Sequence, residues 1–272
     1  MIIDGKSIAN DIIQELKGFP RPEKFLAAFL VGDNPASISF LKQKEGVAKE
    51  LGLDFRLYKF PVEISQDKLR EEILKIVEHK TCGGAIVQLP LPEHISKQYV
   101  LNAIPREKDV DVLGERALGA FYAGRNPVLP PAVGVVEKIL QATSYSLQAK
   151  RVAVLGLGSL IGKPIANWLM GKTKEVYLLD EGSDLALLKE ADLIISGVGK
   201  ANLFSAENLK ENTLVIDFGY DMSGGKISGD FDFSKLKIEN CKLKIDFTPT
   251  PGGTGPILVA KLFENFYRLN QN

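Results

Sequence analysis

Short apolar runs alternate with amphipathic stretches along most of the chain, and this alternation constrains the fold more than any other feature. Residues 25–32 (FLAAFLVG) and 84–89 (GAIVQL) have the length and composition of buried strands. Residues 7–19 and 37–52 carry apolar side chains at helical spacing, with Ser7 as the expected N-cap of the first helix. Such repeats pair their strands in parallel and place helices on both faces of the sheet. The sequence therefore predicts an α/β fold.

The alternation breaks once, between residues 108 and 131, where glycine and proline become frequent and no period is visible. We expect a functional loop there. A helix is expected at 133–145, and the last helix is expected to begin at Pro256. Further strands are expected within 151–155, 175–180, 185–199, 214–219 and 241–247. The pattern predicts two domains, residues 1–130, completed by the C-terminal helix 256–272, and residues 131–255.

Composition excludes several classes of function. The chain has 272 residues, with 34 basic and 34 acidic side chains, so no global field attracts nucleic acid or an anionic membrane. No segment approaches the roughly 20 apolar residues of a membrane span, and the N-terminus lacks a secretory signal. Two cysteines, Cys82 and Cys241, and two histidines suggest neither a disulfide framework nor a zinc site. We expect a cytoplasmic protein without a metal, a nucleic acid partner or a membrane.

A glycine-rich turn lies where a strand meets a helix, in VAVLGLGSLIG at 152–162. Gly156, Gly158 and Gly162 would let pyrophosphate approach the N-terminus of the helix, where free N–H groups and the helix dipole favour negative charge. An ordinary tight turn is the alternative, but the strand, turn and helix together favour a dinucleotide site. The next strand ends on Asp180, whose carboxylate would accept the ribose hydroxyls of NAD and repel the extra phosphate of NADP. A solvated turn residue is the alternative for Asp180.

Eight short blocks recur in the order and spacing of one known family. They are IIDGK at 2–6, VGDNPAS at 31–37, VQLPLP at 87–92, KDVD at 108–111, VGK at 198–200, VIDFG at 215–219, GDFDF at 229–233 and PTPGGTGP at 249–256. Through these blocks the chain resembles the methylenetetrahydrofolate dehydrogenase/cyclohydrolase family along nearly its whole length.

The resemblance implies two α/β domains flanking a folate cleft, the second a Rossmann-type dinucleotide-binding domain with a parallel sheet. It also implies the reaction. Methylene-tetrahydrofolate is oxidised by hydride transfer to NAD or NADP, and the methenyl product is hydrolysed to formyl-tetrahydrofolate. A homodimer formed through the dinucleotide-binding domain is common in this family.

The resemblance also implies which residues act. Lys44 would shuttle a proton or activate water, Gln88 would orient its amine, and Asp111 would hold the pterin edge. The expected substrate-binding residues are Phe40, Pro251, Gly252 and Gly253. The expected cofactor-binding residues are Gly156, Gly158, Ser159, Gly162, Asp180, Gly197, Val198 and Gly199.

Each catalytic residue has a plainer interpretation. A lysine on a helix is usually a solvated surface charge, Gln88 at a strand end could cap backbone groups, and Asp111 could form a turn. In addition, Phe40 stands where the family usually has tyrosine, so a hydroxyl that could assist Lys44 is absent. Two alternatives follow. One is a dehydrogenase with weak or lost hydrolysis, and the other is a silent folate or dinucleotide binder.

Overall fold

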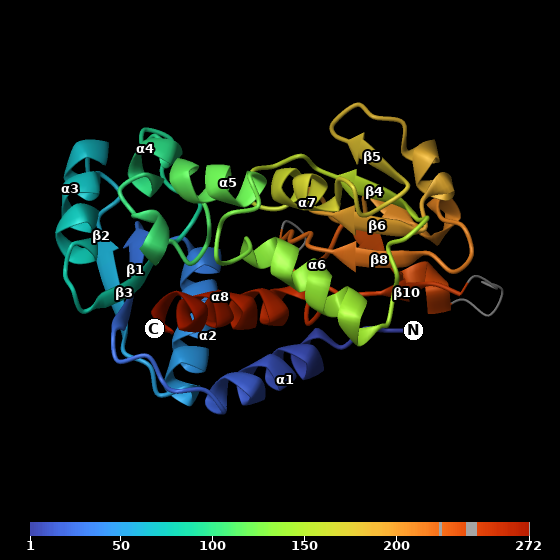
Figure 1. The fold of residues 1–272 in the computed structure, drawn as a ribbon. Helices are drawn as coiled ribbons and strands as arrows, with labels where there is room; N and C mark the ends of the chain where they lie inside the picture. Colours follow the sequence, from blue (N-terminus) through green and yellow to red (C-terminus); the bar gives the residue numbers. More distant parts are fainter. Residues whose placement is uncertain (223–224, 238–243, 272) are drawn as a thin grey trace. The chain divides into compact units, whose positions relative to one another are not determined.

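The computed structural model describes residues 1–222, 225–237 and 244–271, which form two compact units (Figure 1). The five-strand unit comprises Met1–Ala9 and Ala132–Leu258, and the three-strand unit comprises Asn10–Pro131 and Val259–Asn272. The first nine residues therefore group with the second half of the chain, whereas the sequence pattern places residues 1–130 together.

The three-strand unit is built on a parallel sheet in the order β2-β1-β3. Its strands are β1 (Phe25–Val31), β2 (Phe55–Phe60) and β3 (Cys82–Val87), and β1 and β3 are fully buried. Figure 1 shows α3 on one side of this sheet and α2 on the other. The helices are α1 (Gly5–Lys17), which begins in the other unit, α2 (Pro35–Glu50), α3 (Gln66–Val77), α4 (Lys97–Leu101), the 3-10 turn η1 (Arg106–Lys108), α5 (Glu115–Tyr122) and the end of α8 (Thr254–Asn270).

Asx and Ser caps fix the starts of three helices. The side chain of Asn34 accepts from the Ser37 amide at the start of α2, and Ser65 accepts from Lys68 at the start of α3. The sequence predicts Ser7 as the N-cap of α1, and this prediction is wrong. The Asp4 carboxylate instead accepts from the amides of residues 6 and 7, because the helix begins two residues earlier than its apolar period indicates.

The predicted loop at 108–131 is wrong in part, because it contains the helix α5. The segment before this helix is fixed by Asp109, whose Oδ2 accepts from the amides of Leu113 and Gly114 at 3.0 and 2.8 Å. The segment is also held from α8, where Asn265 Nδ2 donates to the carbonyls of Val110 and Leu129, both at 2.8 Å. Polar groups rather than apolar periodicity thus order this region.

The five-strand unit contains a wholly parallel sheet in the order β10-β8-β6-β4-β5. Its strands are β4 (Arg151–Leu155), β5 (Glu175–Leu179), β6 (Leu193–Ser196), β8 (Leu214–Asp217) and β10 (Asp246–Phe247), and β7 (Phe204–Ser205) pairs with β9 (Phe231–Asp232) in a separate ribbon. The helical elements are α6 (Pro131–Ala142), α7 (Gly162–Leu169), η2 (Leu185–Glu190), η3 (Ala206–Asn208), η4 (Ser234–Lys237) and the start of α8.

Several expected boundaries in this unit shift. The strand expected within 185–199 covers only β6, since η2 takes the first six residues. Of the strand expected at 241–247, residues 241–243, including Cys241, lie outside the described residues, and among residues 244–247 the strand β10 forms. The chain start joins this unit because the Ile3 amide and the Met1 carbonyl bond β10 at Phe247. These parallel sheets and their helices confirm the predicted α/β class.

Each unit has its own apolar core. In the three-strand unit, β1 and β3 send side chains such as Phe29 and Val87 against Leu69 and Ile73 of α3. In the five-strand unit, the core includes Leu155, Ile194, Val215 and Phe247. Within the ranges that the structure describes, no helix is long and apolar enough to cross a membrane.

Candidate active site

Lys44 and Gln88 meet at the carboxyl edge of the three-strand sheet. The strand order β2-β1-β3 reverses direction between β1 and β3, and a parallel sheet opens a crevice at such a switch point. The helix α2 leaves the end of β1 and carries Lys44, while Gln88 directly follows β3. The Lys44 Nζ donates to Gln88 Oε1 at 3.1 Å. Residues 44 positions apart in sequence therefore form one polar pair.

The Gln88 side-chain amide both caps the end of its strand and contacts Lys44. Its Nε2 donates to the carbonyl of Leu89 at 2.8 Å, so the amide caps the strand end. This bond fixes which end of the amide faces Lys44, because the remaining Oε1 can only accept. The Ser37 hydroxyl, in the first turn of α2, donates to the same Leu89 carbonyl at 3.4 Å.

Lys44 is buried, and its surroundings shift the pKa of its amine. The side chain is only 5% exposed, and burial lowers the pKa of its amine, although the nearby Asp111 carboxylate acts in the opposite direction. The Phe40 ring lies one turn earlier on α2, with its centroid 5.7 Å from Nζ. The surface-lysine interpretation is therefore wrong for this residue. A lowered pKa makes the amine a better candidate to accept a proton, which is the chemistry of a general base.

Asp111 lies near this pair, in the segment that runs beside β3. Ala85 of β3 bridges to Asp109 in parallel, so residues 109–111 follow the edge of the sheet. Burial raises the pKa of Asp111, while Lys44 lowers it. Asp109, which the sequence pattern did not single out, is 2% exposed and organises the turn after Asp111 through its two backbone bonds. In the sequence, only its place as the first aspartate of the block KDVD drew attention to Asp109.

The glycine turn of the five-strand unit has the geometry of a phosphate cradle. It follows β4 and leads into α7, and Gly156 has a φ of +79°. A Cβ at Gly162 would lie 2.0 Å from the Gly156 carbonyl oxygen, so only glycine allows this close turn. A Cβ at Gly158 would meet nothing within 4 Å, which leaves space beside the backbone. These features fit a dinucleotide pyrophosphate at the N-terminus of α7.

The other predicted cofactor residues lie at the same edge of the same sheet. Asp180 is exposed and directly follows β5, which pairs with β4. Gly197, Val198 and Gly199 follow β6, the other neighbour of β4. The sheet order thus changes direction between β4 and β6, beside the glycine turn. Ser159 lies within the turn itself.

A buried aspartate that sequence reasoning missed holds the 197–200 loop. The Asp230 carboxylate accepts from three successive amides, those of Val198, Gly199 and Lys200, at 2.8–2.9 Å, and from the Ser196 hydroxyl at 2.6 Å. Asp217, at the end of β8, accepts from the amides of Gly219 and Phe231. Both aspartates lie in the blocks VIDFG and GDFDF, which gave the resemblance but no role.

Pro251, Gly252 and Gly253 belong to the five-strand unit, not to the unit that holds Lys44, Gln88 and Asp111. Their turn packs against the start of α1, where a Cβ at Gly5 would lie 1.7 Å from the Gly253 carbonyl oxygen. Pro251 and Gly252 line a pocket of ≈ 480 Å³ together with Ile2, Asp4, Lys6 and Pro249. The structure therefore collects the predicted site residues into two groups, one in each unit.

Two family models match the chain. The model described as the catalytic domain of tetrahydrofolate dehydrogenase/cyclohydrolase matches residues 3–111, and the model of the NAD(P)-binding domain of the same enzymes matches residues 130–272. The first match contains Lys44, Gln88 and Asp111, and the second contains the predicted cofactor-binding residues.

Relatives of the chain match it over nearly its whole length. A bifunctional protein FolD from Bacillus licheniformis is 35% identical, over 97% of this chain and 95% of that protein. The structure of the Campylobacter jejuni bifunctional enzyme FolD, a methylenetetrahydrofolate dehydrogenase/cyclohydrolase, is 34% identical with a TM-score of 0.92, over 99% and 98% of the two chains. The Trypanosoma brucei methylenetetrahydrofolate dehydrogenase-cyclohydrolase, solved with NADP and an inhibitor, is 28% identical with a TM-score of 0.90, over 99% and 96%.

Proposed function

Because the chain belongs to the tetrahydrofolate dehydrogenase/cyclohydrolase family, we propose that Lys44, Gln88 and Asp111 carry out its folate chemistry. The protein is an enzyme of one-carbon metabolism. It oxidises methylene-tetrahydrofolate with a nicotinamide cofactor and hydrolyses the methenyl product to formyl-tetrahydrofolate. The observation that supports the residue assignment best is the buried Lys44 amine, which donates to Gln88 and whose pKa burial lowers.

In the hydrolysis, Lys44 acts as the general base. A water molecule attacks the methenyl carbon, and the neutral amine takes the proton that the water loses. Gln88 Oε1 accepts from the amine before and after this transfer, since both the amine and the ammonium are donors. The Asp111 carboxylate accepts from donors on the pterin edge and stabilises the ammonium that forms.

In the oxidation, the residues position the reactants and exclude water. A nicotinamide cofactor, when bound, would supply the acceptor for the hydride that leaves the methylene carbon. Gly156, Gly158 and Gly162 would hold its pyrophosphate at the start of α7, and Ser159 and residues 197–199 lie at the same edge of the sheet. We propose that the enzyme prefers NAD to NADP, because the exposed Asp180 carboxylate after β5 would repel the 2′-phosphate of NADP. Pro251, Gly252 and Gly253 contact the substrate in this proposal.

A dehydrogenase with weak hydrolysis is the second candidate, and Phe40 favours it. The ring lies 5.7 Å from the Lys44 amine but carries no hydroxyl to hold the attacking water. Hydride transfer depends mainly on alignment, so it is less sensitive to this loss than hydrolysis is. The homodimer and the cytoplasmic location implied by the resemblance complete the proposal.

An assay of both half-reactions with both cofactors tests the proposal. Purified protein, methylene-tetrahydrofolate and NAD should produce the methenyl absorbance, and this absorbance should then decay faster than in buffer. NADP should support a lower rate than NAD. Absence of methenyl product with either cofactor contradicts the proposed activity, and a rate that is higher with NADP contradicts the role of Asp180.

The variant Lys44→Met tests whether Lys44 is the general base of the hydrolysis. It should slow hydrolysis by about 100-fold or more, the usual contribution of a general base, and leave methenyl formation measurable. Lys42→Met is the matched control, because Lys42 lies on the same helix but is exposed. Equal rates of hydrolysis in the two variants would exclude Lys44 as the base.

A further inference from the structure

The residue after Asp111 has a backbone conformation that its own side chain disfavours. Val112 has a φ of +55°, in the left-handed region, and its side chain is 0% exposed. A β-branched residue is strained in this region, because the atoms on its Cβ crowd the backbone. Such strain persists only where the surrounding structure holds it, and it collects at functional sites. Val112 directly follows the carboxylate to which the proposed function assigns the pterin edge.

The other left-handed residues lie in a different setting. Among the described residues, four further non-glycine residues have a positive φ, and they are Ser144, Ala149, Asn202 and Asn212. All four are exposed, none is β-branched, and asparagine tolerates this region better than most residues do. Within the described ranges, Val112 is thus the one left-handed residue that is both buried and β-branched. An ordinary surface turn does not account for it.

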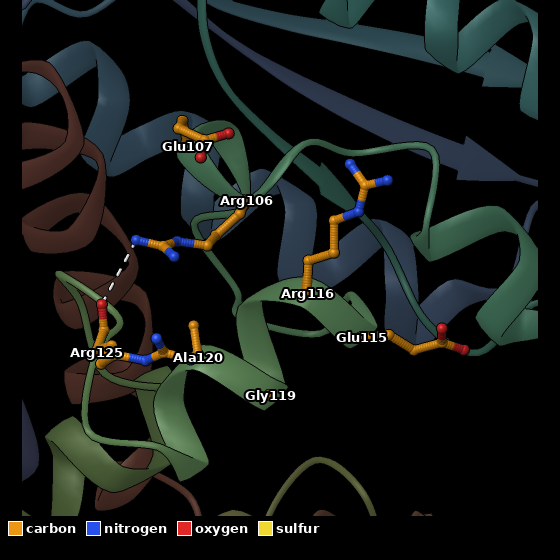
Figure 2. A pocket seen from close by; sticks show the side chains of 7 residues that line it. All are labelled: Arg106, Glu107, Glu115, Arg116, Gly119, Ala120 and Arg125. Atoms are coloured by element: carbon orange, nitrogen blue, oxygen red, sulfur yellow. Dashed lines mark hydrogen bonds between the residues drawn. The ribbon is translucent and has the colours of Figure 1, made fainter.

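The turn that contains Val112 is held at both ends. It joins η1 to α5, and Figure 2 shows side chains of both elements. On one side, the Asn265 amide donates to the Val110 carbonyl at 2.8 Å. On the other side, the buried Asp109 carboxylate accepts from the amides of residues 113 and 114 at 3.0 and 2.8 Å. These bonds oppose relaxation of the backbone at Val112.

The Asp111 carboxylate has no such anchor of its own. It forms no hydrogen bond and no ion pair within the described part of the chain. Asp111 is also only partly buried, so no tight enclosure fixes its side chain. The direction of this carboxylate therefore depends on the backbone that carries it. The conformation of that backbone after Asp111 is set at Val112.

We propose that Val112 is a positioning residue for the folate reaction, because its enclosed and strained backbone fixes where the Asp111 carboxylate meets the pterin edge. This inference rests on the proposed function, in which Asp111 binds the substrate. Glycine at the same place would adopt this φ without strain, and it would adopt many other conformations as easily. The enclosed valine removes those alternatives, so the carboxylate is in place before the substrate arrives.

The variant Val112→Gly tests the proposal in the complete enzyme. We expect its KM for methylene-tetrahydrofolate to rise about 5- to 10-fold, as a weakened charge-assisted bond would give. Its KM for NAD should stay within about twofold of the wild-type value, because the change acts on the folate contact alone. The rate constant kcat should change less than the folate KM, since the pterin contact is made before and during the reaction.

The variant Val112→Ala separates positioning from packing. It removes both methyl groups but keeps the Cβ, so the folate KM should stay within about twofold of the wild-type value. Its urea midpoint should nevertheless be lower than that of Val112→Gly. Alanine loses the packing and keeps the left-handed strain, whereas glycine relaxes that strain. The less stable variant should therefore bind folate better.

Val100→Ala is the matched control, because it removes the same methyl groups from an equally buried valine on α4 and should keep both KM values. A wild-type folate KM in Val112→Gly overturns the positioning role alone. An equal rise of the folate KM in Val112→Ala also overturns it, since lost packing would then be the cause. A urea midpoint of Val112→Gly below that of Val112→Ala overturns the strain at this residue. Wild-type protein that oxidises no methylene-tetrahydrofolate contradicts the proposed function, and the positioning proposal with it.

Discussion

The side chains around Lys44 show how one residue acquires its chemistry from its neighbours. Burial favours the neutral amine, the Asp111 charge limits that effect, and Gln88 fixes the direction of the Nζ donor. Phe40 shields one side of the amine without offering a hydrogen bond. In the proposed hydrolysis Lys44 would accept the proton, and the Phe40 ring beside it offers no hydroxyl to hold the water that supplies that proton.

Phe40→Tyr should increase the rate of hydrolysis by about 10-fold, because a positioned hydroxyl can hold the attacking water near Lys44. The added oxygen extends from a half-buried ring, so the fold should tolerate it. The rate of methenyl decay measures the effect, and the rate of methenyl formation serves as the internal control. An unchanged or lower decay rate would show that the missing hydroxyl does not limit hydrolysis.

The loop 197–200 illustrates how an element is shaped by a residue distant in sequence. Three successive amides point at one carboxylate, that of Asp230, which also accepts the Ser196 hydroxyl. The loop has no regular structure of its own, and Gly199 has a φ of +80°. The two Asp230 oxygens therefore fix where the predicted cofactor residues Gly197–Gly199 lie.

Asp230→Asn should raise the KM for the nicotinamide cofactor by about 10-fold, with a smaller effect on the KM for folate. The amide retains one acceptor oxygen of two, so at least one loop amide or the Ser196 hydroxyl loses its bond. A lost bond to a charged group corresponds to a change of this size. Asp232→Asn is the control on the same segment, because the Asp232 carboxylate accepts from Ser234 and from no residue of the 197–200 loop. Equal shifts in both KM values would indicate general destabilisation instead.

Elements with strong apolar periods were predictable from sequence, and elements ordered by polar contacts were not. The strand β1 and the helix α2 follow directly from their patterns. The helix α5 does not, since glycines and prolines surround it and its turn is fixed by Asp109 and Asn265. The same limit applies to the site. The structure brings Lys44 to Gln88, as the family resemblance implies. No sequence pattern indicated the amides that the carboxylates of Asp217 and Asp230 bind.

At the scale of the whole molecule, each unit contains a buried carboxyl whose pKa rises to about 7. Burial raises the pKa of Asp109 in the three-strand unit to about 7. Burial, with help from the neighbouring Asp230, raises the pKa of Asp217 in the five-strand unit to about 7. In the unfolded chain both groups titrate near 3.8. The folded protein therefore binds more protons than the unfolded chain between about pH 4 and pH 7.

The sign of the pH dependence follows from this difference. Stability from these groups is fully present below the unfolded pKa and is lost as the pH rises through the folded pKa. One such group should lower the free energy of unfolding by about 2–3 kcal/mol between pH 5 and pH 8. We therefore expect the urea midpoint of the protein to fall over this range.

Asp109→Asn should reduce that fall, because the amide keeps an acceptor oxygen for the Leu113 and Gly114 amides but does not ionise. Urea unfolding at pH 5, 6, 7 and 8, followed by circular dichroism, measures the change. Asp11→Asn serves as the control, since Asp11 is exposed on α1 and should keep the wild-type slope. A variant that loses as much stability between pH 5 and pH 8 as the wild type would mean that Asp109 is already ionised at pH 5. Its two backbone hydrogen bonds would then outweigh the cost of burying its charge.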